Sequence, residues 1–294
     1  MNDKAIARAR QRQRARAGGE SRVSVLVHGL LAWVAAFIFF FPVLWMVVTA
    51  FKSEKNAQSS TPNLHLDAGF DSFRETAKAI PGTLTFVKAL GTSLTVVIVS
   101  TIIVLVLAIP ASYALAIRPI TKWRDVLFFF VSTKFLPVAA AILPLYTIFK
   151  HLHLIDKRAV LVIVYISMNL PLAVWMLRSF FGEFPRELLE AAEVDGAGFF
   201  VRLRRVLLPI VAPGIAATAL LCFIFAWNEY FLAVNLTVFD AQTIPIWVTT
   251  TISTRGQFLA KLSAASTLAC LPVVLAGWTA QKRLVRGLTM GAIK

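Results

Sequence analysis

Residues 184–209 read FPRELLEAAEVDGAGFFVRLRRVLLP and separate two long apolar runs. Pro185 is tolerated in the first turn of a helix, and Glu187 places negative charge at the positive end of the helix dipole. Gly196 allows a sharp turn, because glycine adopts backbone conformations that strain other residues. The stretch therefore predicts two short amphipathic helices joined at Gly196, which form a compact knob at a membrane surface. A helix pair lying flat among lipid headgroups is the alternative.

The sequence on both sides of this stretch is that of a membrane protein. Of the 294 residues, 58% are hydrophobic and 15% are charged, which is too little polar material to cover a soluble protein of this size. A helix needs about 20 apolar residues to cross the hydrocarbon core of a bilayer. Six runs meet this length, and they lie at 23–51, 89–117, 126–149, 159–177, within 206–236, and at 262–281. The sequence therefore predicts an all-α, polytopic membrane protein with six transmembrane helices.

The charged residues cluster between these runs. The net charge is +15, from 30 basic and 15 acidic residues. Nineteen of the basic residues fall in one alternating set of connecting segments and ten in the other, while Lys134 lies inside the third run. Because Lys and Arg are retained on the cytoplasmic side, this split predicts that both termini are cytoplasmic. The Arg-rich tail at 1–22 then lies beside lipid headgroups, which explains its charge better than nucleic-acid binding does.

The knob sequence also carries a spaced motif. Glu190-Ala191-Ala192 is followed after three residues by Gly196 and after nine more by Val206, with Leu208-Pro209 just beyond. This pattern resembles the EAA loop of the membrane subunits of ABC importers, with Val206 in the place of an Ile. The resemblance implies that 182–209 is a coupling loop that docks into a cleft on a cytoplasmic ATPase subunit. The coupling residues it implies are Glu190, Ala191, Ala192, Asp195, Gly196, Ala197, Leu208 and Pro209.

Further stretches narrow this resemblance to the second permease subunit of carbohydrate importers of the maltose-transporter type. They are Phe51-Lys52-Ser53, Trp227-Asn228-Glu229-Tyr230 and residues 285–294. The fold that this implies is that of a type I ABC importer permease. It divides the chain into a basic tail at 1–22, a first transmembrane helix at 23–51, an external loop at 52–88, a permease core at 89–281, and a cytoplasmic tail at 282–294 that contacts the ATPase subunits.

The resemblance also implies partners and a location. The partners are a second, unlike permease, two ATPase subunits, an external solute-binding protein and membrane lipid, with no nucleic acid, in the inner membrane of a bacterium. The chain has no glycine-rich phosphate loop ending in Gly-Lys-Ser or Gly-Lys-Thr, so ATP and Mg²⁺ belong to the partner ATPases. We therefore expect that the chain is not an enzyme and that it binds no cofactor. His151 and His153 lack a neighbouring cysteine or carboxylate cluster, so we expect no metal site.

Two charges fall within the predicted membrane depth, where an ionised group is costly unless it is paired or faces a cavity. They are Lys134 in the third run and Glu229 in the fifth. One interpretation is structural, in which they pair with each other or with groups of a partner subunit. The other is a translocation path, in which Asn228 and Glu229 bond solute hydroxyls while an aromatic ring stacks on a sugar. The candidate path residues are Asn228, Glu229, Trp227, Tyr230, Asn169 and Lys134, although in maltose-type transporters most sugar contacts can fall on the other permease.

The segment at 237–258 joins the fifth and sixth runs and is too long for a simple turn. The resemblance implies that it reaches into the open cleft of the docked binding protein and helps to dislodge the sugar. Its candidate residues are Pro245, Trp247 and Thr250. A loop that only caps the bundle is the alternative, because external loops are the variable part of a membrane fold.

The function expected from these features is import of a sugar or sugar alcohol by alternating access, driven by the partner ATPases. Resemblance in the tail and at 244–261 favours a polyol or a small glycoside. The alternative is a secondary transporter or channel that uses Lys134 and Glu229 as a charge relay. Internal repeats would support that alternative, but 26–117 and 159–281 show no duplication.

Overall fold

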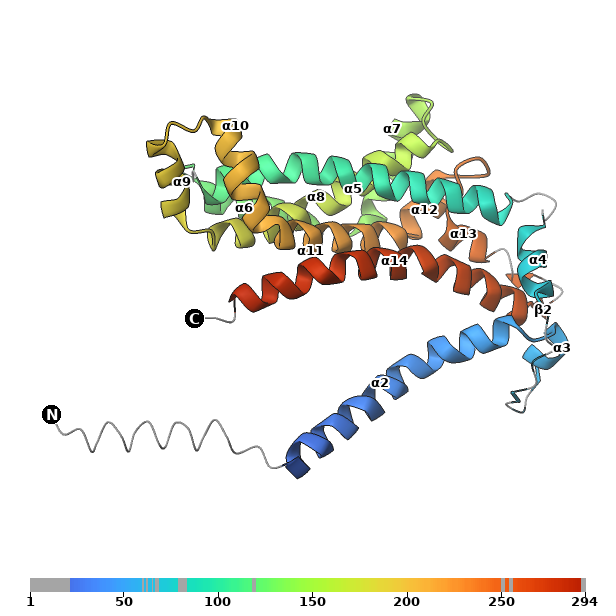
Figure 1. Ribbon diagram of the computed structural model, residues 1–294. Coiled ribbons are helices and arrows are strands. Elements are labelled where there is room, and N and C mark those ends of the chain that lie inside the picture. Colours follow the sequence, from blue (N-terminus) through green and yellow to red (C-terminus); the bar gives the residue numbers. More distant parts are fainter. Residues whose placement is uncertain are drawn as a thin grey trace.

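A computed structural model of the protein shows an elongated bundle of helices (Figure 1). It describes residues 22–59, 61, 63–64, 66, 69–78, 84–117, 120–249, 252–253 and 256–291. The elements before the knob are α2 (Arg22–Ala50), α3 (Glu54–Ala57), α4 (Asp71–Ala77), α5 (Phe86–Ala116), α6 (Trp123–Ser132), a 3₁₀ turn (Thr133–Phe135), α7 (Val138–His151) and α8 (Arg158–Gly182). The remaining elements are α9 (Arg186–Val194), α10 (Phe199–Val201), a π-helical segment (Arg202–Leu207), α11 (Leu208–Trp227), α12 (Phe231–Leu236), α13 (Ile244–Thr249), β1 (Ile252–Ser253), β2 (Gly256–Gln257) and α14 (Leu259–Gly291).

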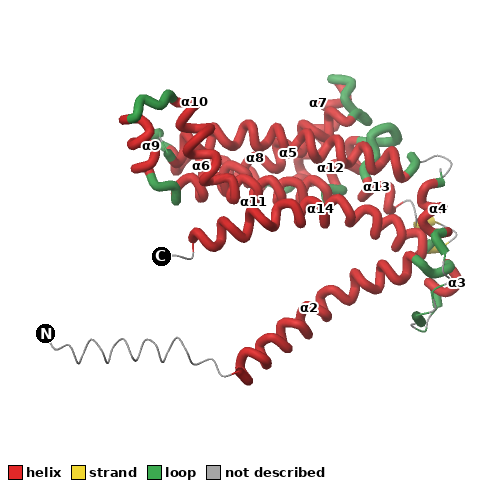
Figure 2. Tube along the Cα trace, viewed as in Figure 1, coloured by secondary structure: helices red, strands yellow, loops and turns green. Residues whose placement is uncertain are grey.

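The all-α class is confirmed, since helices dominate the described chain (Figure 2). The two strands form a small antiparallel ribbon in which Ile252 pairs with Gln257. In the part of the chain that the structure describes, five helices are long and apolar enough to span a membrane. They cover Ser24–Ala50, Phe86–Ala116, Arg158–Gly182, Phe199–Trp227 and Leu259–Gln281. These correspond to five of the six predicted runs.

The third predicted run is not a straight helix. It forms the pair α6 with its 3₁₀ turn and α7, bent by 90° at the break between them. Leu136 at this break has extended backbone angles, φ −65° and ψ 125°. Proline disfavours a helical conformation in the residue before it, so Pro137 explains why the helix stops here. The structure therefore has a sixth span if α6 and α7 together make one broken crossing of the membrane.

The fifth run also differs from the prediction. The helix begins earlier, at Phe199, and passes through the π-helical segment into α11. Pro209 lies at the start of α11 and has no N–H to give to the preceding turn, and a π-helical turn is a common way to absorb such a defect. The helix ends at Trp227, and α12 begins only at Phe231. Glu229 therefore lies at a break between two helices.

The core of the bundle is formed by α5, α8 and α11, with α14 packed beside α11. Ser112 on α5 donates a side-chain hydrogen bond to the carbonyl of Val174 on α8 (3.1 Å). Gly214 lets α11 approach α8 closely, because a Cβ atom there would lie 2.4 Å from Cγ of Phe180. In contrast, α2 diverges from the bundle, and only the C-terminal end of α2 meets the start of α14 (Figure 1). The most apolar stretch of α2 is 0% buried.

The two ends of the bundle differ in architecture. The knob made by α9 and α10 lies at one end, and α3, α4 and the β-ribbon lie at the other (Figure 1). At this second end the carboxylate of Glu54 accepts hydrogen bonds from the backbone N–H groups of Ala260 (3.1 Å) and Lys261 (2.9 Å). A negative charge at the N-terminus of a helix is favourable, so this contact fixes the start of α14.

Candidate functional site

The knob begins with α9, which ends in a Schellman motif. Gly196 has a φ of +77°, a conformation that favours glycine. The N–H of Ala197 bonds the carbonyl of Ala192 (2.9 Å), and the N–H of Gly196 bonds that of Glu193 (3.0 Å). The sharp turn predicted at Gly196 is present. After this turn the chain enters α10 and continues as one helix into the membrane span.

The inner face of the knob is fastened to the C-terminal end of α5. Arg186 Nη2 donates a hydrogen bond to the carbonyl of Ala116 (3.1 Å), which is one of the last carbonyls of that helix. The rings of Tyr113 and Phe199 meet edge to face at 5.5 Å between centroids. Glu193 and Arg202 form an ion pair that closes the knob on itself. Between knob and bundle lies a cavity of about 200 Å³, and Glu190 lines it.

The outer face of the knob carries exposed apolar side chains. Val194 is 88% exposed and Phe200 is 79% exposed, and Leu188 and Val201 are also exposed. Among the predicted coupling residues, Glu190, Ala191, Asp195 and Gly196 are exposed, while Ala192 and Ala197 are half-buried. Leu208 and Pro209 lie apart from these, at the start of α11. A cluster of large apolar side chains in water is typical of a protein-binding surface.

The break after α11 brings together four of the predicted path residues. Trp227 is buried and stacks on Phe223, with ring centroids 5.6 Å apart and planes 11° from parallel. The carboxylate of Glu229 accepts hydrogen bonds from the backbone N–H groups of Leu232 (2.8 Å) and Ala233 (3.1 Å). Glu229 therefore caps α12, and its negative charge is favourable at the N-terminus of that helix. Asn228 and Tyr230 are exposed.

The other two predicted path residues lie elsewhere. Asn169 on α8 is fully buried and donates a hydrogen bond from Nδ2 to the carbonyl of Cys222 on α11 (3.4 Å), while its Oδ1 has no partner among the described residues. Lys134 is exposed in the 3₁₀ turn between α6 and α7. In the described part of the chain no ion pair joins it to Glu229, so the pairing of these two charges considered from sequence is not present.

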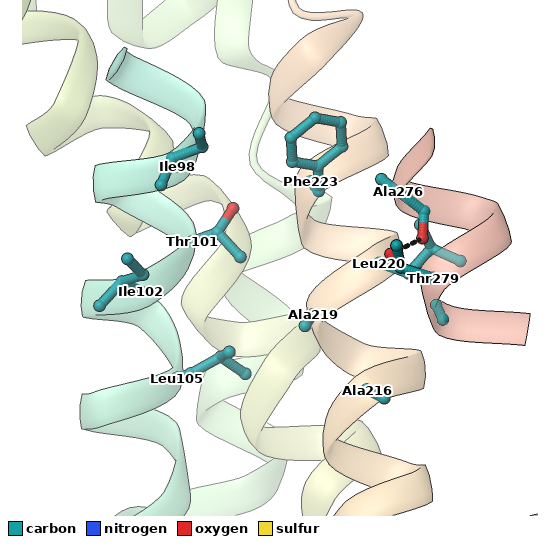
Figure 3. A pocket seen from close by; sticks show the side chains of 11 residues that line it. Ile98, Thr101, Ile102, Leu105, Ala216, Ala219, Leu220, Phe223, Ala276 and Thr279 are labelled. Carbon is teal, nitrogen blue, oxygen red and sulfur yellow. Dashed lines mark hydrogen bonds between the residues drawn. The ribbon is translucent and has the colours of Figure 1, made fainter. Parts of the chain in front are cut away.

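A groove of about 460 Å³ runs between α5, α11 and α14, as Figure 3 shows. Its walls are mostly apolar, with Ile98 and Leu105 facing the small residues Ala216 and Ala219. Thr101 lines the groove, and its hydroxyl oxygen is buried without a hydrogen-bond partner among the described residues. The predicted path residues do not line this groove.

The loops at the end opposite the knob are held by Asp156, a residue that the sequence analysis missed. Its carboxylate accepts hydrogen bonds from four consecutive backbone N–H groups, at distances of 2.9 to 3.1 Å, in residues Val238, Phe239, Asp240 and Ala241. Partial burial acts to raise the pKa of Asp156, but these four donors outweigh it and hold the pKa below its ordinary value. Aspartate in a short loop often accepts backbone hydrogen bonds, which is the one local signal for this role.

The segment that follows is anchored rather than projecting. Trp247 is fully buried against Phe86, and its Nε1 donates a hydrogen bond to the carbonyl of Leu84 (2.9 Å). The N–H of Ile244 bonds Oγ of Ser93 (2.8 Å). Pro245 is half-buried, and Thr250 lies outside the described residues. Of the predicted loop residues, the structure therefore places Trp247 in the core.

Comparison with known proteins identifies the family. The family described as "Binding-protein-dependent transport system inner membrane component" matches residues 108–288. The chain is 33% identical to the diacetylchitobiose uptake system permease protein DasC of Streptomyces coelicolor, over 86% of this chain and 91% of that protein. It is 32% identical to the trehalose transport system permease protein SugB of Mycobacterium tuberculosis, over 86% and 92% of the two chains.

A solved structure supports the same fold. The chain superposes with a TM-score of 0.71, at 21% identity, on a chain of a bacterial ABC transporter involved in the import of the acidic polysaccharide alginate. The match covers 90% of this chain and 98% of the other. The relatives are permease subunits, and the family implies neither enzymatic activity nor a cofactor on such a chain, because the ATPase is a separate subunit. These findings do not favour the secondary transporter or channel. The chain belongs to the family of binding-protein-dependent transport system inner membrane components and is a permease of a sugar ABC importer.

Proposed function

We propose that this chain is one of two unlike permease subunits of an ATP-driven importer in a bacterial inner membrane, with both termini in the cytoplasm. The knob docks on one of the two ATPase subunits of the complex, and an external solute-binding protein docks at the opposite end. The observation that carries the proposal is the set of exposed apolar side chains on the knob, of which Val194 and Phe200 are the most exposed. Such a surface needs a partner, and the family to which the chain belongs works with separate ATPase subunits.

The connections of the knob explain how force from an ATPase would reach the membrane. Arg186 ties the knob to the end of α5, and the helix from Phe199 to Trp227 runs without a loop from the knob into the bundle. A displacement of the knob must therefore move α5 and α11. Because α11 ends beside Asn228 and Glu229, this movement would reach the helix break and alternate the access of the solute.

The position of α2 supports a second permease as partner. Apolar side chains such as Leu26, Trp33 and Phe39 are between 72% and 82% exposed and lie on a helix that stands away from the bundle. Lipid covers such a surface, and a neighbouring permease covers it equally well. The apolar groove between α5, α11 and α14 is a second such surface. The tail at 282–294, part of which lies outside the described residues, is proposed to contact the ATPases.

The proposed solute is a sugar or sugar alcohol, in the class of polyols and small glycosides. The names of the relatives support a sugar, since one is a permease for diacetylchitobiose and another for trehalose. At the helix break, Asn228 offers an amide and Tyr230 an exposed ring and hydroxyl. Uptake of a panel of labelled polyols, disaccharides and amino acids would test the class. Import confined to the amino acids would contradict it.

Docking at the knob can be tested by co-purification. Phe200→Asp places a charge among the exposed apolar side chains of the knob and should strongly reduce co-purification of the ATPase subunits encoded with this chain. Val238→Asp is the matched control, because Val238 is 69% exposed at the opposite end of the molecule. Equal recovery of the ATPases with both variants would contradict docking at this face.

The external segment is proposed to act on the binding protein from an anchored base. Asp156 holds residues 238–241 and Trp247 is anchored to the carbonyl of Leu84, so we assign the action on the binding protein to the remaining residues, 248–257. Replacing residues 248–257 by a short Gly/Ser linker should leave ATPase docking intact and strongly reduce uptake. Normal uptake with normal dependence on the binding protein would show that the loop only caps the bundle.

A further inference from the structure

A second cavity, of about 400 Å³, lies where α2 ends, at the end of the molecule opposite the knob. Its walls come from the last turns of α2, from the loop around α3 and from the start of α14. On the first helix the lining begins with Pro42 and Met46 and continues to Lys52, just past the end of α2, while Leu259 lines the cavity from the start of α14. The polar side chains in the lining include Lys52, Asn63 and Ser263. The cavity therefore changes from apolar to polar along the axis of a membrane-spanning helix.

The polar side holds a buried cation. Lys52 is 5% exposed, its ammonium lies 4.3 Å from the centre of the Trp45 ring, and it donates one hydrogen bond to the carbonyl of Asn63 (2.6 Å). Cation–π contact and one carbonyl recover only part of the hydration that a buried ammonium loses. Two of its three N–H donors have no acceptor among the described residues.

Among the described residues, the carboxylates near Lys52 in sequence have other partners. Glu54 accepts the N–H groups at the start of α14. Asp71 pairs with Arg74 (3.7 Å), and Glu75 pairs with Lys78 (4.0 Å). In the described residues no ion pair includes Lys52. A buried charge without a counter-ion is costly. Lys52 has no counter-ion among the described residues, so an anion bound from outside the chain would stabilise it.

A second polar atom in the same cavity also lacks a partner. Oδ1 of Asn63 is buried and accepts no hydrogen bond within the described part of the chain. An amide oxygen needs a donor, whereas the ammonium of Lys52 needs a negatively charged acceptor. A ligand that satisfies both carries an anionic group and a hydroxyl a short distance apart.

We propose that this cavity binds the headgroup of an anionic glycerophospholipid such as phosphatidylglycerol. The phosphate accepts hydrogen bonds from Lys52, the glycerol hydroxyl donates to Asn63, and the acyl chains lie along the exposed apolar face of α2. The position fits, because Trp and Lys side chains at the end of a membrane helix lie at the level of the headgroups. The site does not depend on which sugar the importer carries. It would hold α2 at a fixed angle to α14, against which α2 packs.

The test is lipid binding by the full-length protein purified in detergent, followed by native mass spectrometry. The probes are dioleoylphosphatidylglycerol, dioleoylphosphatidylcholine and free sn-glycerol 3-phosphate. We expect the first to bind, the second to bind weakly and the third not to compete at equal concentration. Lys52→Gln should weaken binding of dioleoylphosphatidylglycerol by about tenfold or more, because it removes a charge-assisted hydrogen bond. Lys55→Gln is the matched control, since Lys55 is exposed and its loss changes the net charge equally.

A variant that leaves Lys52 in place keeps the proposal falsifiable if Lys52→Gln does not fold. Ser263→Phe fills the cavity from α14 and should abolish dioleoylphosphatidylglycerol binding while the protein stays folded. Equal binding by Ser263→Phe and the unmodified protein would overturn the site. Equal weakening by Lys52→Gln and Lys55→Gln would show that the lipid binds through general surface charge and not at this cavity, and would overturn the site. Competition by sn-glycerol 3-phosphate would show a soluble phosphate ester as the ligand instead of a lipid.

Discussion

Oδ2 of Asp156 accepts a hydrogen bond from the backbone N–H of Asp240 at 2.9 Å, although 84 residues separate them in the chain. Three neighbouring N–H groups donate to the same carboxylate. The backbone N–H of Asp156 itself donates to the carbonyl of Leu236 (3.0 Å). Each of the two segments therefore donates hydrogen bonds to the other. This clamp ties the loop between α7 and α8 to the segment that follows α12. It fixes the base of the external loop that we propose acts on the binding protein.

Replacing Asp156 by Asn removes one of the two acceptor oxygens and presents an NH₂ group to backbone donors. We expect Asp156→Asn to raise the concentration of binding protein needed for half-maximal ATPase stimulation, while basal ATPase activity stays normal. Asp240→Asn is the matched control, because the clamp uses only the backbone N–H of Asp240. An unchanged half-maximal concentration in Asp156→Asn would contradict a positioning role.

The clamp also predicts a pH dependence of stability. The pKa of Asp156 is lowered in the folded protein, so its contribution is present above the unfolded-state pKa of about 3.9 and is lost as the pH falls through the folded value. The difference in melting temperature between the unmodified protein and Asp156→Asn should therefore be largest near pH 7 and shrink below about pH 4. A difference that grows on acidification would contradict this assignment.

Gly196 allows a sharp test of coupling. A Cβ atom at this position meets nothing within 4 Å, so Gly196→Val would act through backbone strain at a φ of +77°. Strain of this kind costs about 1–2 kcal/mol, and it should misalign the knob and uncouple ATP hydrolysis from uptake. Gly198→Val is the control, since Gly198 has equal space and a φ of −66° that valine adopts readily. Normal assembly and unchanged uptake in Gly196→Val would contradict the prediction.

Much of this architecture could be predicted from the sequence, because membrane spans depend on the length of apolar runs. The turn at Gly196 was also predictable, because a glycine between two short amphipathic segments indicates a sharp turn. Pro137 marked a break inside the third run, but proline also occurs within straight spans here, such as Pro171 in α8. The cap of α12 by Glu229 was not predictable, because the sequence suggested one helix through Glu229, whereas α11 ends at Trp227 and α12 begins at Phe231. The four donors to Asp156 lie 82 to 85 residues away, and no local pattern shows such a pairing.

The structural and transport roles of the helix break can be separated by two substitutions. Glu229→Gln keeps one acceptor oxygen but loses the charge at the start of α12, which should cost about 1 kcal/mol of stability. Asn228→Ala should leave the melting temperature nearly unchanged and raise the KM for uptake, because Asn228 is exposed. An unchanged melting temperature with a raised KM in Glu229→Gln would contradict the capping role and would indicate that Glu229 contacts the solute.

The close packing of α8 and α11 predicts a stability effect. Gly214→Ala would bring a Cβ atom against the Phe180 ring, and such overpacking costs about 1–3 kcal/mol. Gly91→Ala in α5 is the control, since a Cβ atom there meets nothing within 4 Å and alanine favours a helix. Melting temperatures in detergent should fall for the first variant and not for the second. Equal values would contradict the contact between Gly214 and Phe180.

The most direct test of the central claim is solute uptake by proteoliposomes that hold this chain, its partner permease and the ATPase subunits. The account predicts uptake that requires ATP on the side of the knob and the binding protein on the opposite side. It also predicts that uptake persists when the proton and sodium gradients are collapsed. Uptake by this chain alone, driven by an ion gradient and indifferent to ATP, would contradict it.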